Sequence, residues 1–456
     1  MLNDNVFRAY DIRGVAERDF QDDDVIALGF AFGQMVNQGG GSRVCVGHDC
    51  RLSGERLYSA FCEGVLRAGI DVFGLGMVGT PISYFAEHQY RADGAVSITG
   101  SHNPSDWNGF KFSLFKSAMF GDGIQQLRLG AQQNLPSASR AQLTHIKPLE
   151  AYLEYVLSQL KPLERDVHVI CDAGNGMAGS VAPELYRRMG AQVSELYCEP
   201  DGRFPNHHPD PTELHNLDDL RTFVQKEKAD VGLAFDGDAD RLGVISADGR
   251  VVWGDQLLLL FAQNILKSIP GAQFLAEVKC SETLFEGVRK AGGRIEMGKV
   301  GHSLIKARMK ETGAVLAGEM SGHLFFQNRF LGFDDGIYAG ARLLELLGRN
   351  EANLSTFLDQ LPKRSATPEI RIDCDDEIKF GVVDVVTNHF RDEFEIIDVD
   401  GMRLKTNHGW VLLRASNTQP ALVMRVEADS DHHLQGLKSM VQEVVQEKMA
   451  QMVCSS

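Results

Sequence analysis

Short apolar runs alternate with amphipathic stretches over the first two thirds of the chain. The most regular arrangement occurs three times, in residues 42–76, 166–197 and 272–301. Each segment has an apolar strand-like run, a polar or glycine-bearing loop, an amphipathic helix ending at glycine, and a second β-branched run. The pattern predicts three β-loop-α-β units, hence mixed α/β domains with largely parallel strands. Chance similarity among α/β units is the alternative to true internal repetition.

The last ninety residues have a different pattern. Strand-like runs at 369–374, 394–416 and 421–430 are separated by turns and followed by a long amphipathic helix at 431–453. This pattern predicts an α+β domain. Boundaries are expected where proline, glycine or charge interrupts the apolar pattern, which gives four domains: 1–147, 148–250, 251–362 and 363–456.

Composition narrows the range of partners. The 456 residues are 43% hydrophobic and 24% charged, and no run approaches the roughly 18 apolar residues of a membrane-spanning helix. The net charge of −16 argues against nucleic acid or an anionic membrane as partner. Eight cysteines without a C-x-x-C pair, and a start without an apolar signal core, favour a cytoplasmic protein. We expect small-molecule partners and a monomer or weak homo-oligomer.

The first candidate chemical site is the loop TGSHNP, residues 99–104, which follows the apolar run GAVSI. Ser101 lies beside His102 in a tight, glycine- and proline-containing loop. The loop does not match the G-x-S-x-G elbow of serine hydrolases, which would need glycine at 99 and 103. The sequence leaves two interpretations open: a nucleophilic serine, or a turn whose polar side chains cap a helix.

The second candidate site is an acidic loop. Asp236, Asp238 and Asp240 occupy alternate positions after an apolar strand. Carboxylates this close repel one another unless a cation lies among them, and oxygen ligands suit Mg²⁺ or Ca²⁺. An EF-hand is excluded because the sixth loop residue is Arg241 and the twelfth is Ala247. An acidic surface turn remains possible, as does a haloacid-dehalogenase type of phosphotransferase with Asp236 as nucleophile.

The third candidate site is the segment GEMSGH, in which Glu319, Ser321 and His323 alternate. Alternation in an extended chain places the three side chains on one face. A carboxylate, a hydroxyl and an imidazole together suit recognition of vicinal hydroxyl groups. A polar turn before an apolar strand explains the segment equally well.

The fourth candidate site is RASNTQP, residues 414–420, between two apolar strands. The Arg414 guanidinium offers a planar donor fork to a phosphate. Ser416, Asn417 and Thr418 add donors, and the backbone N–H groups of such a turn can surround an anion. The loop favours a phosphate site over a plain turn.

The four loops, in this order, resemble the signature loops of the α-D-phosphohexomutase family, and the resemblance covers essentially the whole chain. Met320 in GEMSGH is similar to the phosphomannomutase/phosphoglucomutase group, whereas phosphoglucosamine mutases tend to have glutamine there. The resemblance implies three related α/β domains and a C-terminal α+β domain around a central cleft. It also implies a phosphohexomutase that interconverts hexose 1-phosphate and hexose 6-phosphate, of mannose, glucose or both.

The resemblance further implies a covalent phosphate on Ser101 and one Mg²⁺, held by Ser101, Asp236, Asp238 and Asp240. Hexose 1,6-bisphosphate would be the intermediate and activator. The remaining catalytic residues would be Arg13, His102, Lys111, Arg241 and His302, with Lys111 and His302 as candidates for moving the hydroxyl proton. Substrate-binding residues would be Tyr10, Lys279, Glu319, Ser321, His323, Arg414, Ser416, Asn417 and Thr418.

Two positions depart from the family pattern. Gly100 stands where the family usually has alanine, and Ala239 stands where the metal loop usually has glycine. Because alanine is disfavoured at positive φ, we predict a negative φ at Ala239. Three alternatives to the mutase of mannose and glucose phosphates remain open: a phosphoglucosamine mutase, a phosphotransferase with Asp236 as nucleophile, and a non-catalytic sugar-phosphate-binding protein.

Overall fold

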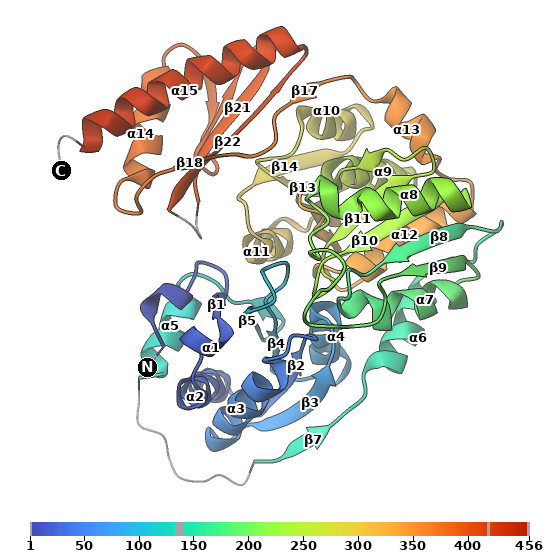
Figure 1. The fold of residues 1–456 in the computed structure, drawn as a ribbon, viewed down its shortest axis with the longest axis vertical. Coiled ribbons are helices and arrows are strands. Elements are labelled where there is room, and N and C mark those ends of the chain that lie inside the picture. The colour runs from blue at the N-terminus through green and yellow to red at the C-terminus, as the bar shows by residue number, and fades with distance from the viewer. Residues whose placement is uncertain (1, 133–140, 417–419, 454–456) are drawn as a thin grey trace.

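The structure, a computed structural model, describes residues 2–132, 141–416 and 420–453. The described residues form four sheets that follow one another along the chain (Figure 1). None of the described helices combines the length and the apolar character needed to cross a bilayer.

The first sheet has the order β1-β5-β4-β2-β3-β7, with β6 paired to β5. Its strands are β1 (Ile12–Val15), β2 (Arg43–His48), β3 (Asp71–Met77), β4 (Gly94–Ile98), β5 (Trp107–Leu114), β6 (Ser117–Ala118) and β7 (Leu143–His145). Its helices are η1 (Asp4–Val6), α1 (Ala16–Asp19), α2 (Asp22–Gln38), α3 (Gly54–Arg67), α4 (Thr80–Gln89) and α5 (Asp122–Gly130).

The second sheet has the order β12-β11-β10-β8-β9. Its strands are β8 (His168–Asp172), β9 (Gln192–Leu196), β10 (Val231–Phe235), β11 (Leu242–Ser246) and β12 (Val251–Val252). The accompanying helices are α6 (Leu149–Gln159), η2 (Met177–Ser180), α7 (Ala182–Arg188), η3 (Leu214–Leu217) and α8 (Asp218–Glu227). Strand β12 lies just past the boundary expected after residue 250 and still pairs with this sheet.

The third sheet has the order β14-β13-β15-β16. Its strands are β13 (Gln273–Glu277), β14 (Arg294–Gly298), β15 (Leu316–Gly318) and β16 (Leu324–Phe326). Its helices are α9 (Gly254–Ser268), α10 (Glu282–Lys290), α11 (His302–Thr312), α12 (Gly336–Gly348) and α13 (Leu354–Gln360).

The fourth sheet is antiparallel, with the order β17-β22-β21-β20-β19 and β18 paired to β22. Its strands are β17 (Ser365–Ala366), β18 (Ile370–Asp373), β19 (Glu395–Ile397), β20 (Met402–Lys405), β21 (Gly409–Ala415) and β22 (Ala421–Ala428). Helices α14 (Lys379–Phe390) and α15 (Asp431–Val453) lie along one side of it, as the predicted α+β domain requires (Figure 1).

The first three sheets share one topology. The strand orders β3-β2-β4-β5, β9-β8-β10-β11 and β14-β13-β15-β16 each consist of three parallel strands followed by an antiparallel one. The glycines that end the three unit helices, Gly69, Gly190 and Gly292, have positive φ values of 83°, 96° and 84°. The three β-loop-α-β units are therefore real, and chance similarity of pattern does not explain a shared four-strand order.

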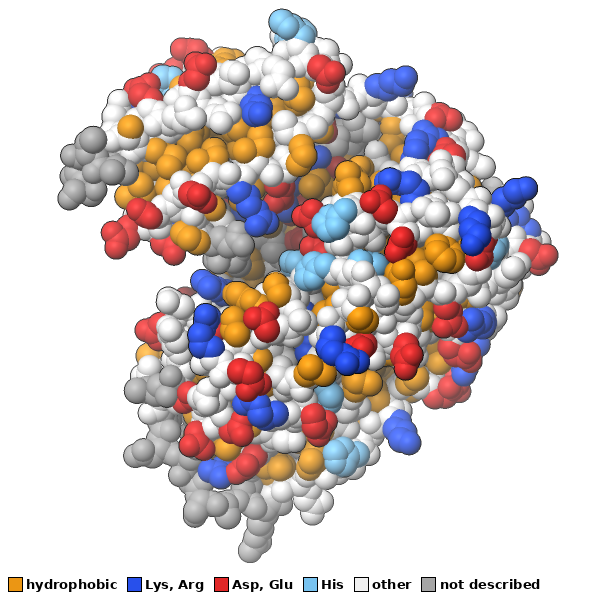
Figure 2. Space-filling view, in the orientation of Figure 1, with side chains coloured by type: hydrophobic (Ala, Val, Ile, Leu, Met, Phe, Trp, Pro, Cys, Tyr) orange, Lys and Arg blue, Asp and Glu red, His pale blue; other side chains and the backbone are white. Residues whose placement is uncertain are grey.

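This topology determines where the polar loops lie. The serine, aspartate and GEMSGH loops each connect the last parallel strand of a unit to the antiparallel strand, in the turns β4–β5, β10–β11 and β15–β16. Residues 416–420 likewise connect two neighbouring strands, β21 and β22. Figure 2 shows a deep notch between the C-terminal domain and the first domain. One apolar cluster links residues of the first three domains, whereas the C-terminal domain has a separate core.

Candidate active site

Ser101 is held in an uncommon backbone conformation at the end of β4. Its φ is +50°, and its side chain is almost completely buried. The hydroxyl donates a hydrogen bond to Asp236 Oδ2 at 3.0 Å, and His102 Nδ1 lies 3.2 Å from Ser101 Oγ. The serine and aspartate loops, which are 135 residues apart in sequence, therefore meet at the Ser101 oxygen.

Two residues that the sequence analysis missed hold the serine loop in this shape. Asp49 accepts a hydrogen bond from Thr99 Oγ1 at 2.7 Å, and Thr99 Oγ1 accepts one from the Ser101 N–H at 2.8 Å. The buried Arg51 guanidinium pairs with Asp49 and donates to four loop carbonyls, those of Ser101, Asn103, Pro104 and Trp107. Their only sequence signal is an Asp-x-Arg after an apolar strand.

The three aspartates form a buried cluster with a cation beside it. Asp236, Asp238 and Asp240 are fully buried, and one carboxylate oxygen of each lies within 4.8 Å of the others. Lys111 Nζ lies 2.7 Å from Asp238 Oδ2 and 2.5 Å from Asp240 Oδ2. Among the described residues, the second oxygens of Asp238 and Asp240 have no hydrogen-bond partner. Unpartnered carboxylate oxygens in an oxygen-only cluster fit a hard dication such as Mg²⁺.

Burial and charge act differently on the members of this cluster. Burial, reinforced by Asp240 and Asp238, raises the pKa of Asp236 well above its usual range. Burial also raises the pKa of Asp238, but the Lys111 ammonium outweighs it and holds that pKa below its usual value. Burial lowers the pKa of Lys111, and its two carboxylate partners more than reverse this effect. Lys111 is therefore a fixed positive charge at neutral pH, next to the ionised Asp238.

The predicted negative φ at Ala239 is wrong, because its φ is +68°. The turn is held from three sides: the Ala239 N–H donates to Asp236 O, the Gly336 N–H donates to Ala239 O, and the Thr80 N–H donates to Asp238 O. Two of these contacts come from distant segments, and the three together enforce the left-handed conformation that brings the carboxylates together. The strain of a non-glycine residue in this region, about 1–2 kcal/mol, is outweighed by them.

The GEMSGH loop meets the aspartate loop and the start of α11. Arg241 Nε donates to His323 Nε2 at 3.1 Å. Glu319 Oε1 accepts from the Gly301 N–H at 2.9 Å, and Ser321 Oγ donates to Glu319 Oε2 at 3.2 Å. The three alternating side chains of this loop therefore lie between the cluster of three aspartates and the N-terminus of α11.

His302 lies in a buried group centred on a residue that the sequence analysis also missed, Asp334. Asp334 Oδ2 is 3.5 Å from His302 Nδ1 and 3.3 Å from His323 Nδ1, and Lys306 Nζ binds the other oxygen at 2.8 Å. Neither ring nitrogen of His302 has a hydrogen-bond partner within the described part of the chain. Burial and then Lys306 lower the pKa of His302 well below its usual value, so the imidazole is neutral.

The remaining predicted site residues lie against different partners. Lys279 Nζ is 2.8 Å from Glu369, and Arg414 Nε is 3.1 Å from Asp400. Arg13 pairs with Asp11, and Tyr10 Oη donates to Val300 O at 2.9 Å. Arg13 Nη1 also lies 3.5 Å from Asn103 Oδ1, in the serine loop. The Ser416 N–H donates to Ala421 O across the β21–β22 turn, while Asn417 and Thr418 lie outside the described residues.

Family models match this chain in four consecutive segments. The matches are to the α/β/α domains I, II and III of phosphoglucomutase/phosphomannomutase, at residues 4–126, 150–249 and 253–365, and to the C-terminal domain of the same proteins at residues 369–444.

Several curated proteins are similar over nearly the whole length. A phosphomannomutase/phosphoglucomutase of Pseudomonas putida is 44% identical over 96% of this chain and 95% of its own. A phosphoglucomutase of Neisseria gonorrhoeae is 41% identical over 97% of each chain. The solved structure of a phosphoglucomutase/phosphomannomutase family protein from Burkholderia thailandensis superposes with a TM-score of 0.90, at 40% identity and 98% coverage of both chains.

Proposed function

The chain belongs to the phosphoglucomutase/phosphomannomutase family, and from that premise we propose that it moves a phosphoryl group between the 1- and 6-positions of glucose and mannose phosphates. The observation that supports this most directly is the position of Ser101 Oγ, buried 3.0 Å from Asp236 at the edge of a carboxylate cluster. A seryl oxygen there can carry a phosphate beside a bound dication.

The phosphoryl group on Ser101 passes to the free hydroxyl of a hexose monophosphate, giving a hexose 1,6-bisphosphate. The bond between phosphorus and the seryl oxygen breaks as the bond to the sugar oxygen forms, and the hydroxyl proton leaves. After the bisphosphate turns round, its other phosphate returns to Ser101. The same loops serve both half-reactions.

A metal and the cations of the site would stabilise charge during transfer. Mg²⁺ held by Asp236, Asp238, Asp240 and an oxygen of the seryl phosphate would neutralise charge on the transferring group, which matters most in a loose transition state. Arg13, Lys111 and Arg241 add fixed positive charge on the protein side. His102 Nδ1 lies 3.2 Å from Ser101 Oγ, where it would neighbour the seryl phosphate.

We assign His302 as the group that accepts the proton of the attacking sugar hydroxyl. Its imidazole is neutral, and a neutral imidazole with a free ring nitrogen can accept the hydroxyl proton. The ammonium of Lys111 is held in its charged form by Asp238 and Asp240, so Lys111 supplies charge rather than a base. Both residues were candidates for this step, and their surroundings support this division of roles.

Substrate contacts come from the other loops. Glu319, Ser321 and His323 would bind the sugar hydroxyls, which are presented similarly in both orientations. The phosphate that is not reacting would be bound by the C-terminal turn, with Lys279 and Tyr10 at its margin; the turn residues are Arg414, Ser416, Asn417 and Thr418. Arg414 is paired with Asp400, and Lys279 is paired with Glu369. The incoming phosphate would take the place of these carboxylates as partner of the two cations.

The surroundings of Asp236 favour a metal ligand over the Asp-nucleophile alternative. Asp236 accepts a hydrogen bond from the Ser101 hydroxyl and shares a buried oxygen-only cluster with Asp238 and Asp240. A non-catalytic sugar-phosphate-binding protein would not require the contact between Ser101 and Asp236. We also propose a cytoplasmic location, supported by free thiols at all seven described cysteines, and a monomer or weak homo-oligomer.

A coupled mutase assay with glucose 1-phosphate and with mannose 1-phosphate tests the proposal. Ser101→Ala should lose nearly all activity, whereas Ser105→Ala, an exposed serine of the same loop, should retain it. Intact-mass analysis with peptide mapping should find one phosphate on Ser101. Full activity of Ser101→Ala would support the Asp236 mechanism instead. Absence of activity toward both sugars, with glucosamine 1-phosphate turned over, would assign the chain to the phosphoglucosamine alternative.

A further inference from the structure

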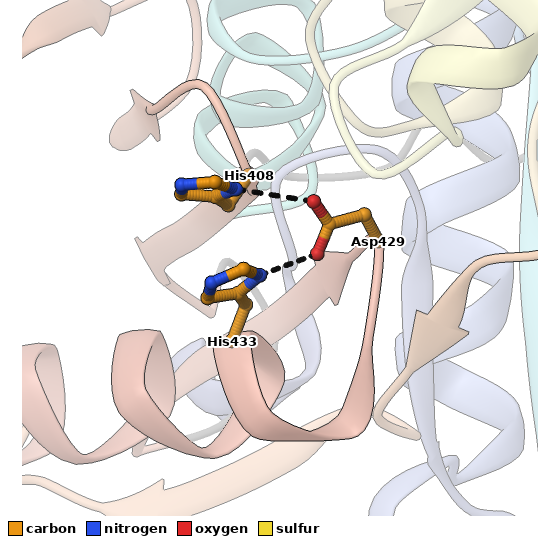
Figure 3. A group of neighbouring side chains, drawn as sticks. All are labelled: His408, Asp429 and His433. Carbon is orange, nitrogen blue, oxygen red and sulfur yellow. Dashed lines mark hydrogen bonds and ion pairs between the residues drawn. The ribbon is translucent and has the colours of Figure 1, made fainter.

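A second group of potential metal ligands lies on the surface of the C-terminal domain, outside the proposed active site. His408 is in the turn between β20 and β21, Asp429 follows β22, and His433 is in the first turn of α15 (Figure 3). Asp429 lies between the two imidazoles: Oδ2 is 3.1 Å from His408 Nδ1, and Oδ1 is 2.6 Å from His433 Nδ1. One ligand atom of each residue lies within 4.8 Å of the other two.

The backbone holds these three residues in place. The Asp429 N–H donates to His408 O at 2.9 Å, which continues the β21–β22 ladder beyond its Gly409–Ala428 pair. The Ser430 hydroxyl accepts from the His433 N–H and so fixes the start of α15. Because strand pairing and the helix start already position the side chains, little ordering would be needed to bind an ion.

The distances suit a small tetrahedral ion. Donor atoms bound to Zn²⁺ at about 2.0–2.1 Å are about 3.3 Å apart in tetrahedral geometry. The two separations between Nδ1 and carboxylate oxygen, 2.6 and 3.1 Å, differ from that spacing by less than 1 Å. The imidazole rings are stacked, with centroids 3.8 Å apart and planes 22° apart, so both present the same edge to Asp429 (Figure 3). A small opening of the pair would admit an ion.

We propose that His408, Asp429 and His433 form a second metal site, selective for a borderline transition-metal dication such as Zn²⁺. Two nitrogen donors and one carboxylate suit Zn²⁺, Ni²⁺ or Cu²⁺, whereas Mg²⁺ prefers oxygen ligands. The side chains are partly open to solvent, with exposed fractions of 55% for His408, 47% for Asp429 and 37% for His433. An ion can therefore enter, and water can complete its coordination.

A bound ion would join three segments of the C-terminal domain. It would fasten the β20–β21 turn and the end of β22 to the first turn of α15, which packs on β21 and β22. An ion that binds only the folded domain stabilises it by RT ln(1 + [ion]/Kd), so the stability rises with the ion concentration. The competing explanation is a plain hydrogen-bonded clamp, in which Asp429 accepts one N–H from each imidazole and no ion binds.

Isothermal titration of the full-length, tag-free chain with Zn²⁺ in excess Mg²⁺ distinguishes these explanations. The excess Mg²⁺ is added to occupy the proposed Mg²⁺ site at Asp236, Asp238 and Asp240. The wild type should bind one Zn²⁺, and His408→Ala and His433→Ala should each weaken binding by about tenfold or more, since a ligand rather than a supporting group is lost. His432→Ala is the matched control, because its ring stands beside His433 but outside the cluster.

Each result decides the proposal. A wild type that binds no stoichiometric Zn²⁺ would leave the clamp as the explanation, and binding that survives in the double variant of His408 and His433 would place the ion elsewhere. Equal losses in His432→Ala would indicate non-specific binding to exposed imidazoles. Thermal melts without Zn²⁺ show whether the variants are folded, and Asp429→Asn, which keeps an acceptor oxygen but loses the charge, should also bind more weakly.

Discussion

Replacing Gly100 by alanine tests whether Arg51 determines the shape of the serine loop. A Cβ added at Gly100 would lie 2.4 Å from Arg51 Cζ, 2.6 Å from Nε and 2.8 Å from Nη1. The guanidinium cannot easily move away, because it is buried, pairs with Asp49 and donates to four carbonyls of the loop. This packing gives a physical reason for the glycine where the family usually has alanine.

The size of the effect follows from these contacts. Carbon atoms in ordinary van der Waals contact lie about 3.5 Å apart, so either Arg51 or the loop must shift by about 1 Å. Overpacking of this kind costs about 1–3 kcal/mol, and each hydrogen bond lost from a charged donor costs about 1.5–3 kcal/mol. We therefore expect the free energy of unfolding to fall by about 3 kcal/mol or more. A displacement of about 1 Å at Ser101 should lower kcat by about 100-fold.

Urea unfolding followed by circular dichroism measures the first effect, and the coupled mutase assay measures the second. Gly436→Ala is the control, because an added Cβ at this position of α15 meets nothing within 4 Å and should stabilise the helix by up to about 1 kcal/mol. If Gly100→Ala changes both the stability and kcat by less than the control does, Arg51 does not set the conformation of the serine loop.

Four further variants test separate contacts. Lys111→Met leaves the buried carboxylates with one cation fewer, so without Mg²⁺ it should lower the free energy of unfolding by about 3–5 kcal/mol. Added Mg²⁺ should raise the Tm of the variant more than that of the wild type, and equal rises would contradict the shared cluster. Burial raises the pKa of Glu87 from 4.5 to about 6, so the folded chain binds this proton more tightly than the unfolded chain does. The folded state therefore loses about 2 kcal/mol of stability as the pH rises from 4.5 through 6. Glu87→Gln should flatten this decline in urea unfolding, and an unchanged slope would refute the assignment. Ala239→Gly should change the free energy of unfolding by less than about 1 kcal/mol, because relief of backbone strain is offset by the loss of methyl burial and by the greater entropy of the unfolded chain. A loss above about 2 kcal/mol would show that the left-handed turn is not strained. Asp334→Asn removes a negative charge that raises the pKa of His302, so the acid limb of the kcat profile should move to lower pH while Km changes little. A change in Km alone would assign Asp334 to substrate binding.

The sequence predicted the features that depend on short-range pattern. Apolar periodicity and the glycines at 69, 190 and 292 identified the three repeated units, because strand, helix and cap each have a local signature. The four polar loops were recognisable because residue type and spacing limit the chemistry that a loop can support. Equivalent positions in repeated units then explain why these loops occur at matching turns.

Arg51, Asp334 and Lys306 were missed because each acts on a residue that only the fold brings near. Arg51 contacts a loop about fifty residues away, and Asp334 gathers two histidines and a lysine from other segments. No local pattern distinguishes such residues from ordinary charged positions.

The sequence by itself determined which side chains carry the chemistry and which turns hold them. The tertiary structure decided their ionisation and backbone conformation. Ser101 and Ala239 adopt positive φ because hydrogen bonds from distant segments, such as those from Arg51 to Ser101 O and from Gly336 to Ala239 O, outweigh a local preference of about 1–2 kcal/mol. His302 is neutral and Lys111 is charged because burial removes water from both, while only Lys111 is paired with two carboxylates.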